Sequence, residues 1–157
     1  MKKIFTLIIP LIFLFSCQPK VETVEEDTNL IEYDSVLASK LGADDYGMSR
    51  YVMAFLKRGP NRPKDSVHSA ELQKAHMDNI GRMAEEGKLS LAGPFLSDGD
   101  LRGIYIFNVE TVEEAEALTN SDPAIQYGSL EMELIPWYGS AALKLINDYQ
   151  KKISKQD

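Results

Sequence analysis

The sequence predicts an α+β domain whose elements follow the order strand, helix, strand, strand, helix, strand. Three observations lead to this order. Short apolar runs of strand type occur four times, two stretches with apolar residues at helical spacing lie between them, and turn-forming residues separate the second run from the third. This is the order of the ferredoxin-like split βαβ sandwich, in which two helices cover one face of a four-stranded sheet.

The four expected strands differ in how their apolar residues are arranged. The first and third runs are apolar on both faces, whereas the last run alternates strictly between apolar and charged residues. Turn chemistry at 59–63 ends the first run, and 97–100 forms a hairpin-type loop. The expected strands are 51–56, 88–92, 104–109 and 130–134.

The first expected helix lies around His76 and ends before Gly87, which is a plausible left-handed stop. Its inner stripe is spaced at i, i+4, i+8 and i+11 and consists of Leu72, His76, Ile80 and Met83. The second helix opens at a capping box formed by Thr111 and Glu114. An Asp122–Pro123 pair interrupts it, and 141–151 predicts a terminal helix.

Two helices leave one face of the sheet uncovered. Because the first and third strands carry apolar side chains on both faces, the second face needs an apolar partner. The economical partner is a second copy of the same sheet, so we expect a homodimer packed sheet to sheet.

Composition narrows the classes of partner. The net charge of −7 and the pI near 4.9 argue against a nucleic acid held through phosphate contacts. One cysteine excludes an internal disulfide, and no zinc-type ligand spacing occurs, so we expect no metal site.

The N-terminus has the features of a bacterial lipoprotein signal. Two lysines precede an apolar run at 4–15, and the sequence Leu-Phe-Ser-Cys ends at Cys17, the only cysteine. Residues 1–16 are then the signal peptide and Cys17 the site of lipidation. An uncleaved anchor helix or an ordinary signal peptide are the alternatives. Gln18 follows the cysteine in place of the aspartate that retains many lipoproteins in the inner membrane, which favours the outer membrane of the cell envelope.

The remaining chain divides into three parts. Residues 17–48 comprise the lipidated cysteine and an acidic tether, in which 35–41 could form a short helix without a clear cap. Residues 49–138 form the folded domain, and 139–157 form a C-terminal helix and tail.

The domain resembles the YciI-like (YCII-related) domain family. The resemblance covers roughly 51–137 and rests on the helix histidine, the run GKLSLAGP, the EEA of the second helix and the Asp-Pro before a glycine. It implies the dimeric α/β-barrel form of the ferredoxin-like fold. It also implies an acid/base centre of a histidine and an aspartate, which correspond to His76 and Asp122, and at least one relative eliminates chloride from a chlorinated hydroxyquinol.

The chemistry of His76 also follows from the residues themselves. An imidazole titrates near neutrality, and a neighbouring carboxylate fixes its tautomer and stabilises the imidazolium. The alternative for His76 is a core histidine that bonds one backbone carbonyl. The alternative for Asp122 is a helix N-cap before proline, and this capping role can coexist with a role in the site. Gly93 and Pro94 could let the backbone approach a ligand, and Arg58 could bind an anionic substrate from the first loop.

These features leave three hypotheses for the function. The first is a cofactor-free lyase, isomerase or dehydrohalogenase that uses His76 and Asp122 on a small organic substrate, with aromatic compounds among the candidates. The second is a non-catalytic module that binds a small molecule in the same cleft. The third is a dimeric interaction protein of the cell envelope, held at the membrane by its lipid anchor.

Overall fold

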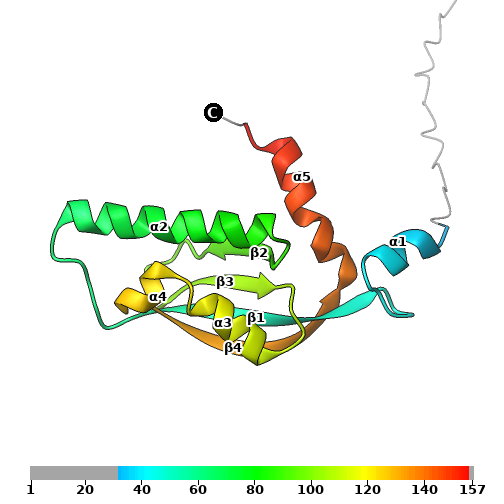
Figure 1. Ribbon diagram of the computed structural model, residues 1–157, viewed down its shortest axis with the longest axis horizontal. Helices are drawn as coiled ribbons and strands as arrows, with labels where there is room; N and C mark the ends of the chain where they lie inside the picture. The colour runs from blue at the N-terminus through cyan, green and yellow to red at the C-terminus, as the bar shows by residue number, and fades with distance from the viewer. Residues whose placement is uncertain (1–31, 156–157) are drawn as a thin grey trace, which may run out of the picture. The chain divides into compact units, whose positions relative to one another are not determined.

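The computed structural model describes residues 32–155 (Figure 1). The expected signal peptide, Cys17 and the first part of the expected tether lie outside the described residues. The helices and strands are α1 (Ser35–Lys40), β1 (Met48–Arg58), α2 (Ser66–Glu85), β2 (Leu89–Pro94), β3 (Leu101–Phe107), α3 (Val112–Thr119), α4 (Pro123–Tyr127), β4 (Leu130–Ser140), the 3-10 helix η1 (Ala141–Leu145) and α5 (Ile146–Ile153).

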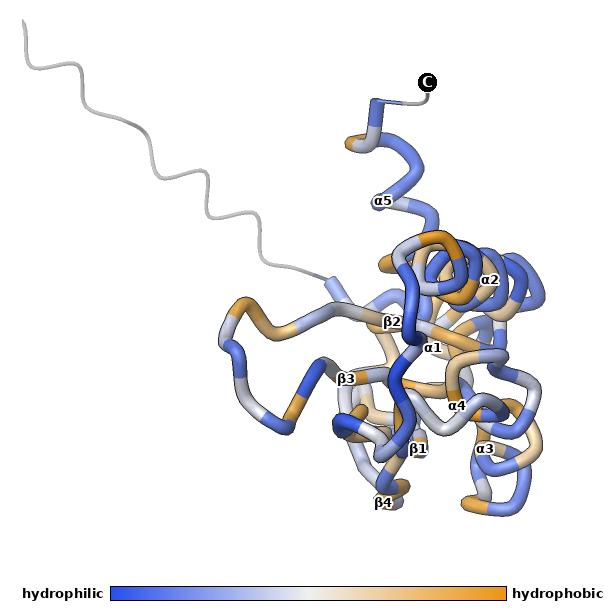
Figure 2. Tube along the Cα trace, turned by 90° about the vertical axis from the view of Figure 1, so that its left-hand side faces the viewer, coloured by the Kyte–Doolittle hydropathy of each residue, from blue (hydrophilic) through white to orange (hydrophobic). Residues whose placement is uncertain are grey.

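The four strands form one antiparallel sheet in the order β2-β3-β1-β4. Helices α2, α3 and α4 lie on the same side of this sheet (Figure 2). The order β1-α2-β2-β3-α3-β4 along the chain confirms the predicted ferredoxin-like α+β architecture. The additional α4 follows the Asp122–Pro123 pair that was expected to interrupt the second helix.

The core lies between the sheet and the helices that cover it. In β1 every second residue points toward the helices, so Val52, Ala54 and Leu56 pack beside Tyr105 and Phe107 of β3. The helices contribute apolar residues to the same cluster, among them Met83 of α2 and Ala115 of α3. Burial of this cluster holds α2 in a fixed position over the end of the sheet.

Both edge strands contain a proline and are longer than predicted. The expected second strand stopped before Gly93, but β2 continues through Gly93 and Pro94, and β4 continues past Pro136 to Ser140. An edge strand tolerates proline because its outer side needs no backbone N–H for pairing. The prolines were therefore misread as strand ends.

The helix ends follow the local signals. Gly87 has a φ of 69°, as its predicted role as a left-handed stop requires, and the capping box of Thr111 and Glu114 is present. Helix α2 begins five residues earlier than the predicted range 71–86 because the side chain of Asp65 accepts a hydrogen bond from the N–H of His68.

The folded unit begins at Tyr33, and the short helix that 35–41 was expected to allow is present within it as α1. The cap that the sequence reading missed is Asp34, whose side chain accepts a hydrogen bond from the N–H of Leu37 at the start of α1. Leu41 after α1 is buried. The acidic run therefore ends in a capped helix that belongs to the domain.

The C-terminal segment starts as a 3-10 helix and continues as α5, where one α-helix was expected. Lys144 fixes the segment to the sheet because its ammonium donates hydrogen bonds to the carbonyl of Leu41 and the hydroxyl of Ser49. None of the helices in the described part of the chain has the length and apolarity needed to span a bilayer.

The other face of the sheet carries apolar side chains that no helix on the α2 side can cover. Met53, Phe55 and Ile104 point to this face and are half-buried. The hairpin loop between β2 and β3 protrudes on this side, where orange segments mark its hydrophobic residues (Figure 2). Two of them, Phe95 and Leu96, are exposed.

Candidate active site

A cavity of about 370 Å³ lies between α2 and the sheet, at the end where β1 and β2 finish and β3 begins. Its wall is mostly apolar, with a few polar side chains among the apolar ones, which is the usual composition of a small-molecule site. The lining residues are Leu56, Gln73, His76, Met77, Ile80, Ala92, Gly93, Pro94, Arg102, Gly103, Tyr105 and Leu130.

His76 and Asp122 form a buried pair at this cavity. The Nδ1 atom of His76 lies 2.8 Å from Oδ2 and 3.0 Å from Oδ1 of Asp122. His76 is only 7% exposed and Asp122 is 0% exposed, so bulk water does not compete for the contact. The structure therefore brings together the two residues that the sequence reading proposed as an acid/base pair.

Asp122 is also the N-cap of α4. Its Oδ1 accepts a hydrogen bond of 2.8 Å from the N–H of Ala124, and Pro123 occupies the first position of the helix. The capping role and the contact with His76 therefore occur at the same carboxylate, as the sequence allowed. The capping hydrogen bond orients the carboxylate of Asp122 so that it faces the imidazole of His76.

A side-chain network holds the segment before Asp122 against α2. The Oδ1 atom of Asn79 accepts hydrogen bonds from Nη2 of Arg82 at 2.8 Å and from the hydroxyl of Ser121 at 3.3 Å. Because Asn79 and Arg82 lie one turn and nearly two turns beyond His76 on α2, the network aligns the helix with the α4 N-terminus.

Tyr105 is a member of the site that the sequence reading did not single out. Its hydroxyl lies 3.3 Å from Nε2 of His76, and the two rings are stacked with 20° between their planes. Burial, and secondarily the charge of Asp122, raise the pKa of Tyr105 well above its ordinary value, so its hydroxyl stays protonated. The strand alternation that points Tyr105 at α2 is the only signal that could have indicated it.

The hydrogen-bond partners define the tautomer of His76. A carboxylate can only accept, so Nδ1 carries the proton and donates it to Asp122. The Nε2 atom is then an acceptor, and the Tyr105 hydroxyl donates to it. The chain of groups therefore runs from Asp122 through His76 to Tyr105, which also lines the cavity.

The other expected site residues are not all in the cavity. Gly93 and Pro94 line it, but Arg58 does not, because it lies at the end of β1 with its Nε 4.0 Å from a carboxylate oxygen of Asp100. The arginine that does line the cavity is Arg102, at the start of β3. The sequence did not indicate Arg102, because the third strand was expected to begin at residue 104, whereas β3 begins at Leu101.

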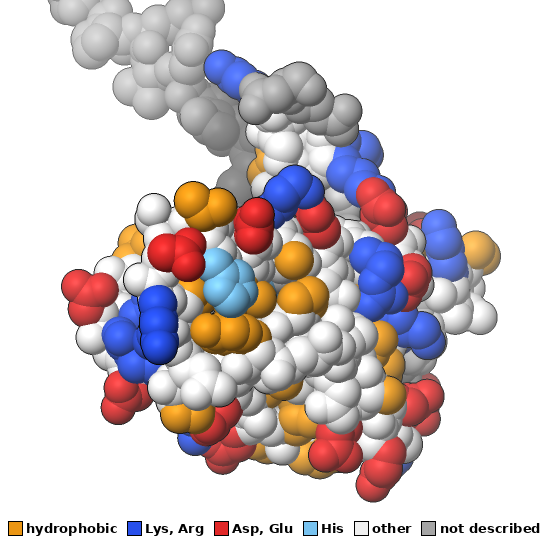
Figure 3. All heavy atoms as spheres, turned by 60° about the vertical axis from the view of Figure 1, so that its left-hand side comes forward, with side chains coloured by type: hydrophobic (Ala, Val, Ile, Leu, Met, Phe, Trp, Pro, Cys, Tyr) orange, Lys and Arg blue, Asp and Glu red, His pale blue; other side chains and the backbone are white. Residues whose placement is uncertain are grey.

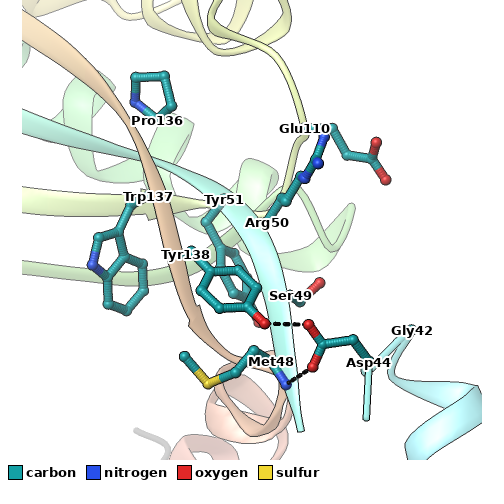
Figure 4. Close-up of a pocket in the computed structure, with 10 residues that line it drawn as sticks. All are labelled: Gly42, Asp44, Met48, Ser49, Arg50, Tyr51, Glu110, Pro136, Trp137 and Tyr138. Carbon is teal, nitrogen blue, oxygen red and sulfur yellow. Dashed lines mark hydrogen bonds between the residues drawn. The ribbon is translucent and has the colours of Figure 1, made fainter. Parts of the chain in front are cut away.

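A larger and more open hollow of about 860 Å³ lies at the other end of β1 (Figure 4). The Tyr138 hydroxyl is hydrogen-bonded to the carboxylate of Asp44 there, and the ring of Tyr51 lies beside that of Trp137 with centroids 5.8 Å apart. The Asp44 and Tyr138 side chains are exposed, and none of the residues that line this hollow forms a buried acid/base pair. The smaller cavity is therefore the better candidate for chemistry.

The surface and the acidic side chains give no sign of a metal centre in residues 32–155. Acidic and basic side chains are interspersed on the face shown in Figure 3, with hydrophobic side chains around one histidine. Across this part of the chain, no three His, Cys, Asp or Glu side chains cluster in a way that could hold a metal ion.

These observations define a class of protein: a small ferredoxin-like domain with a buried histidine–aspartate pair beneath its longest helix. The YCII-related domain model matches residues 53–138, which is more than half of the chain, and the chain belongs to this family. The uncharacterized protein YjpA of Bacillus subtilis (strain 168) is 32% identical over 62 residues, covering 40% of this chain and 71% of that protein.

One of the solved structures with some similarity to this chain is an enzyme. It is the 5-chloro-2-hydroxyhydroquinone dehydrochlorinase TftG of Burkholderia phenoliruptrix AC1100, in a complex with 2,5-dihydroxybenzoquinone. It is 19% identical, with a TM-score of 0.41, and the match covers 55% of this chain and 92% of that chain.

Proposed function

We propose that the protein is an acid/base catalyst that moves a proton on a small organic substrate without a bound cofactor. The observation that carries the proposal is the buried contact between His76 and Asp122 at the wall of a mostly apolar cavity. A histidine in such a pair is a common general base in enzymes, and the apolar wall strengthens its electrostatic interaction with Asp122.

The proposed reaction starts with the removal of a proton from the substrate. His76 accepts the proton at Nε2, either directly or through the Tyr105 hydroxyl, and Asp122 stabilises the resulting imidazolium through Nδ1–H. The imidazolium can return the proton to another atom of the substrate, which is an isomerisation. Alternatively, a halide or hydroxide leaves with its bonding electrons, which is an elimination.

Membership of the YCII-related family favours elimination from an aromatic or otherwise unsaturated substrate. The sequence resembles a family in which at least one member removes chloride from a chlorinated hydroxyquinol, and that chemistry needs the same two steps. Dehydrohalogenation is therefore the first reaction to assay, followed by isomerisation of small carbonyl compounds.

Halide release from a panel of chlorinated hydroxyaromatic compounds tests this proposal. The comparison is between the wild-type protein and the variants His76→Gln and Asp122→Asn. We expect release by the wild type, a loss of about 10²-fold or more in His76→Gln, and an intermediate loss in Asp122→Asn. Turnover that survives in His76→Gln contradicts the assignment of the base.

A binding module is the second candidate, and one observation favours it. Both nitrogens of His76 already have partners within the protein, so the pair is satisfied without any reaction. A compound that raises the melting temperature and is recovered chemically unchanged after prolonged incubation would support binding without catalysis.

We propose further that two copies pack through the open face of the sheet. The half-buried apolar residues Met53, Phe55 and Ile104 and the exposed Phe95 and Leu96 of the protruding hairpin support this arrangement. Light scattering measures the mass in solution. We expect a dimer for the wild type and a monomer for Phe55→Glu, whereas a monomeric wild type would exclude the arrangement.

Lipidation at Cys17 is proposed from the sequence alone. An acylated protein would be held at the envelope, with the outer membrane favoured by Gln18. Mass spectrometry of the mature protein is expected to find a diacylglyceryl group on an N-terminal Cys17, and Cys17→Ser is expected to release the protein from the membrane fraction. A mature chain that starts at another residue would contradict the proposal.

A further inference from the structure

Arg102 is the one cationic side chain among the residues that line the site cavity. It is half-buried, and its Nη1 donates a long hydrogen bond of 3.3 Å to the carbonyl of Gly99. No carboxylate of residues 32–155 lies within ion-pair distance of it. The guanidinium therefore keeps N–H donors that no acceptor in residues 32–155 occupies.

Four other cationic side chains of the domain have an acidic partner, and the pairs are Lys57–Glu133, Arg58–Asp100, Lys74–Asp78 and Arg82–Glu86. These pairs are on the surface and contribute little to stability. A cation at the wall of an apolar cavity differs from these surface cations, because it is less hydrated. Pairing with an anion is therefore more favourable there than on the surface.

The cavity limits the size of that partner. A volume of about 370 Å³ is at the low end of the range for small-molecule sites, which fits a molecule of about one ring. The cavity is narrow beside Gly103, where β2 and β3 pair. A Cβ atom on Gly103 would lie 2.6 Å from the carbonyl oxygen of Gly93, so only glycine fits at this position.

We propose that the cavity binds a small planar anion, of about one ring, whose carboxylate or phenolate oxygen pairs with the guanidinium of Arg102. This inference rests on the proposed function, because it names the substrate class of the same site. With its anionic oxygen at Arg102, the molecule lies in the cavity that His76 and Tyr105 also line. Arg102 then selects the substrate, and His76 and Asp122 perform the proton transfer.

Binding of simple probes to the full-length chain tests the proposal without knowledge of the natural substrate. The probes are benzoate and 4-nitrophenolate as anions of the two kinds, and benzamide as the uncharged counterpart of benzoate. Calorimetry or ligand-observed NMR compares the wild type with Arg102→Gln, with Arg102→Lys and with Arg58→Gln, which removes a nearby arginine outside the cavity.

We expect at least one anion to bind the wild type more tightly than benzamide, and we expect Arg102→Gln to weaken that binding by about 10- to 100-fold. Arg102→Lys restores part of it, and Arg58→Gln leaves it unchanged. Which anion binds distinguishes a carboxylate substrate from a phenolate. Equal binding by the wild type and Arg102→Gln, or no binding of either anion to the wild type at millimolar concentrations, would overturn the proposal.

The variant His76→Gln separates this inference from the proposed catalysis. Because His76 lines the same cavity, Arg102→Gln is also compared in the His76→Gln background, where we expect the same loss of anion binding of about 10- to 100-fold. If that loss occurs and halide release continues in His76→Gln, the catalytic proposal fails and the anion site remains. If Arg102→Gln binds as the wild type does while His76→Gln abolishes turnover, the anion site fails and the catalytic proposal remains.

Discussion

Replacing Asp122 is expected to destabilise the fold by an amount that the structure lets us divide into two parts. Asp122→Ala removes the cap on the N–H of Ala124, which costs about 1 kcal/mol. It also leaves Nδ1–H of His76 buried without an acceptor, which costs about 1–3 kcal/mol. The free energy of unfolding is therefore expected to fall by about 2–4 kcal/mol in total.

Two further variants isolate the contribution of the histidine contact. Asp122→Asn keeps a single side-chain oxygen, which at the position of Oδ1 can accept from both Ala124 N–H and Nδ1–H of His76, so we expect a loss of about 1 kcal/mol. Asp65→Ala is the matched control, because Asp65 caps α2 through the N–H of His68 and contacts no buried imidazole. It is expected to lose only the capping contribution of about 1 kcal/mol.

Urea unfolding of residues 33–157, followed by circular dichroism at pH 7, measures these differences at constant m-value. The reasoning is refuted if Asp122→Ala is no less stable than Asp65→Ala, because the contact with His76 would then contribute nothing. It is also refuted if Asp122→Asn is as unstable as Asp122→Ala. In ¹⁵N NMR spectra, the Nδ1–H tautomer of His76 is expected to predominate in the wild type and to lose that dominance in Asp122→Asn.

Three other predictions concern the packing around the site. Burial, and then the charge of Asp122, raise the pKa of Tyr105 in the folded protein, so the unfolded chain loses this proton first as pH rises. The free energy of unfolding should therefore fall above about pH 10, and it should fall less steeply in Tyr105→Phe. Gly103→Ala places a Cβ atom 2.6 Å from the carbonyl oxygen of Gly93. This variant should therefore have a lower melting temperature and should bind the anionic probes at most half as well as the wild type. Unchanged stability would contradict the close approach of β2 and β3. Thr111→Ala breaks the capping box of α3 and should cost about 1 kcal/mol in urea unfolding, with a loss below about 0.3 kcal/mol as the contrary result.

The arrangement of the core was predictable because it depends on periodicity. The helical spacing that includes His76 placed that residue on the buried stripe, and the apolar runs gave the order of strands and helices along the chain. The Asp-Pro pair likewise indicated a cap at Asp122, and the structure has one. Each of these features depends on residues close together in the sequence.

The parts that sequence reasoning missed depend on distant contacts. Tyr105 and Arg102 line the cavity because β3 lies under α2 and begins at Leu101, before the expected strand 104–109. Pro94 and Pro136 were misread because their strands are edge strands, a position that only the pairing of the sheet determines. Arg58 does not line the cavity, and its role in substrate binding stays a prediction.

The double use of Asp122 has a consequence for how the family can diverge. Because one carboxylate both starts a helix and holds the histidine, a descendant without the proposed catalysis would still need it to remain folded. Drift would remove a residue such as Arg102 sooner, since the described domain makes little structural use of its guanidinium. Within such a lineage, an intact histidine–aspartate pair would outlast the activity, and the cavity arginine would be the better marker of proteins that still turn over a substrate.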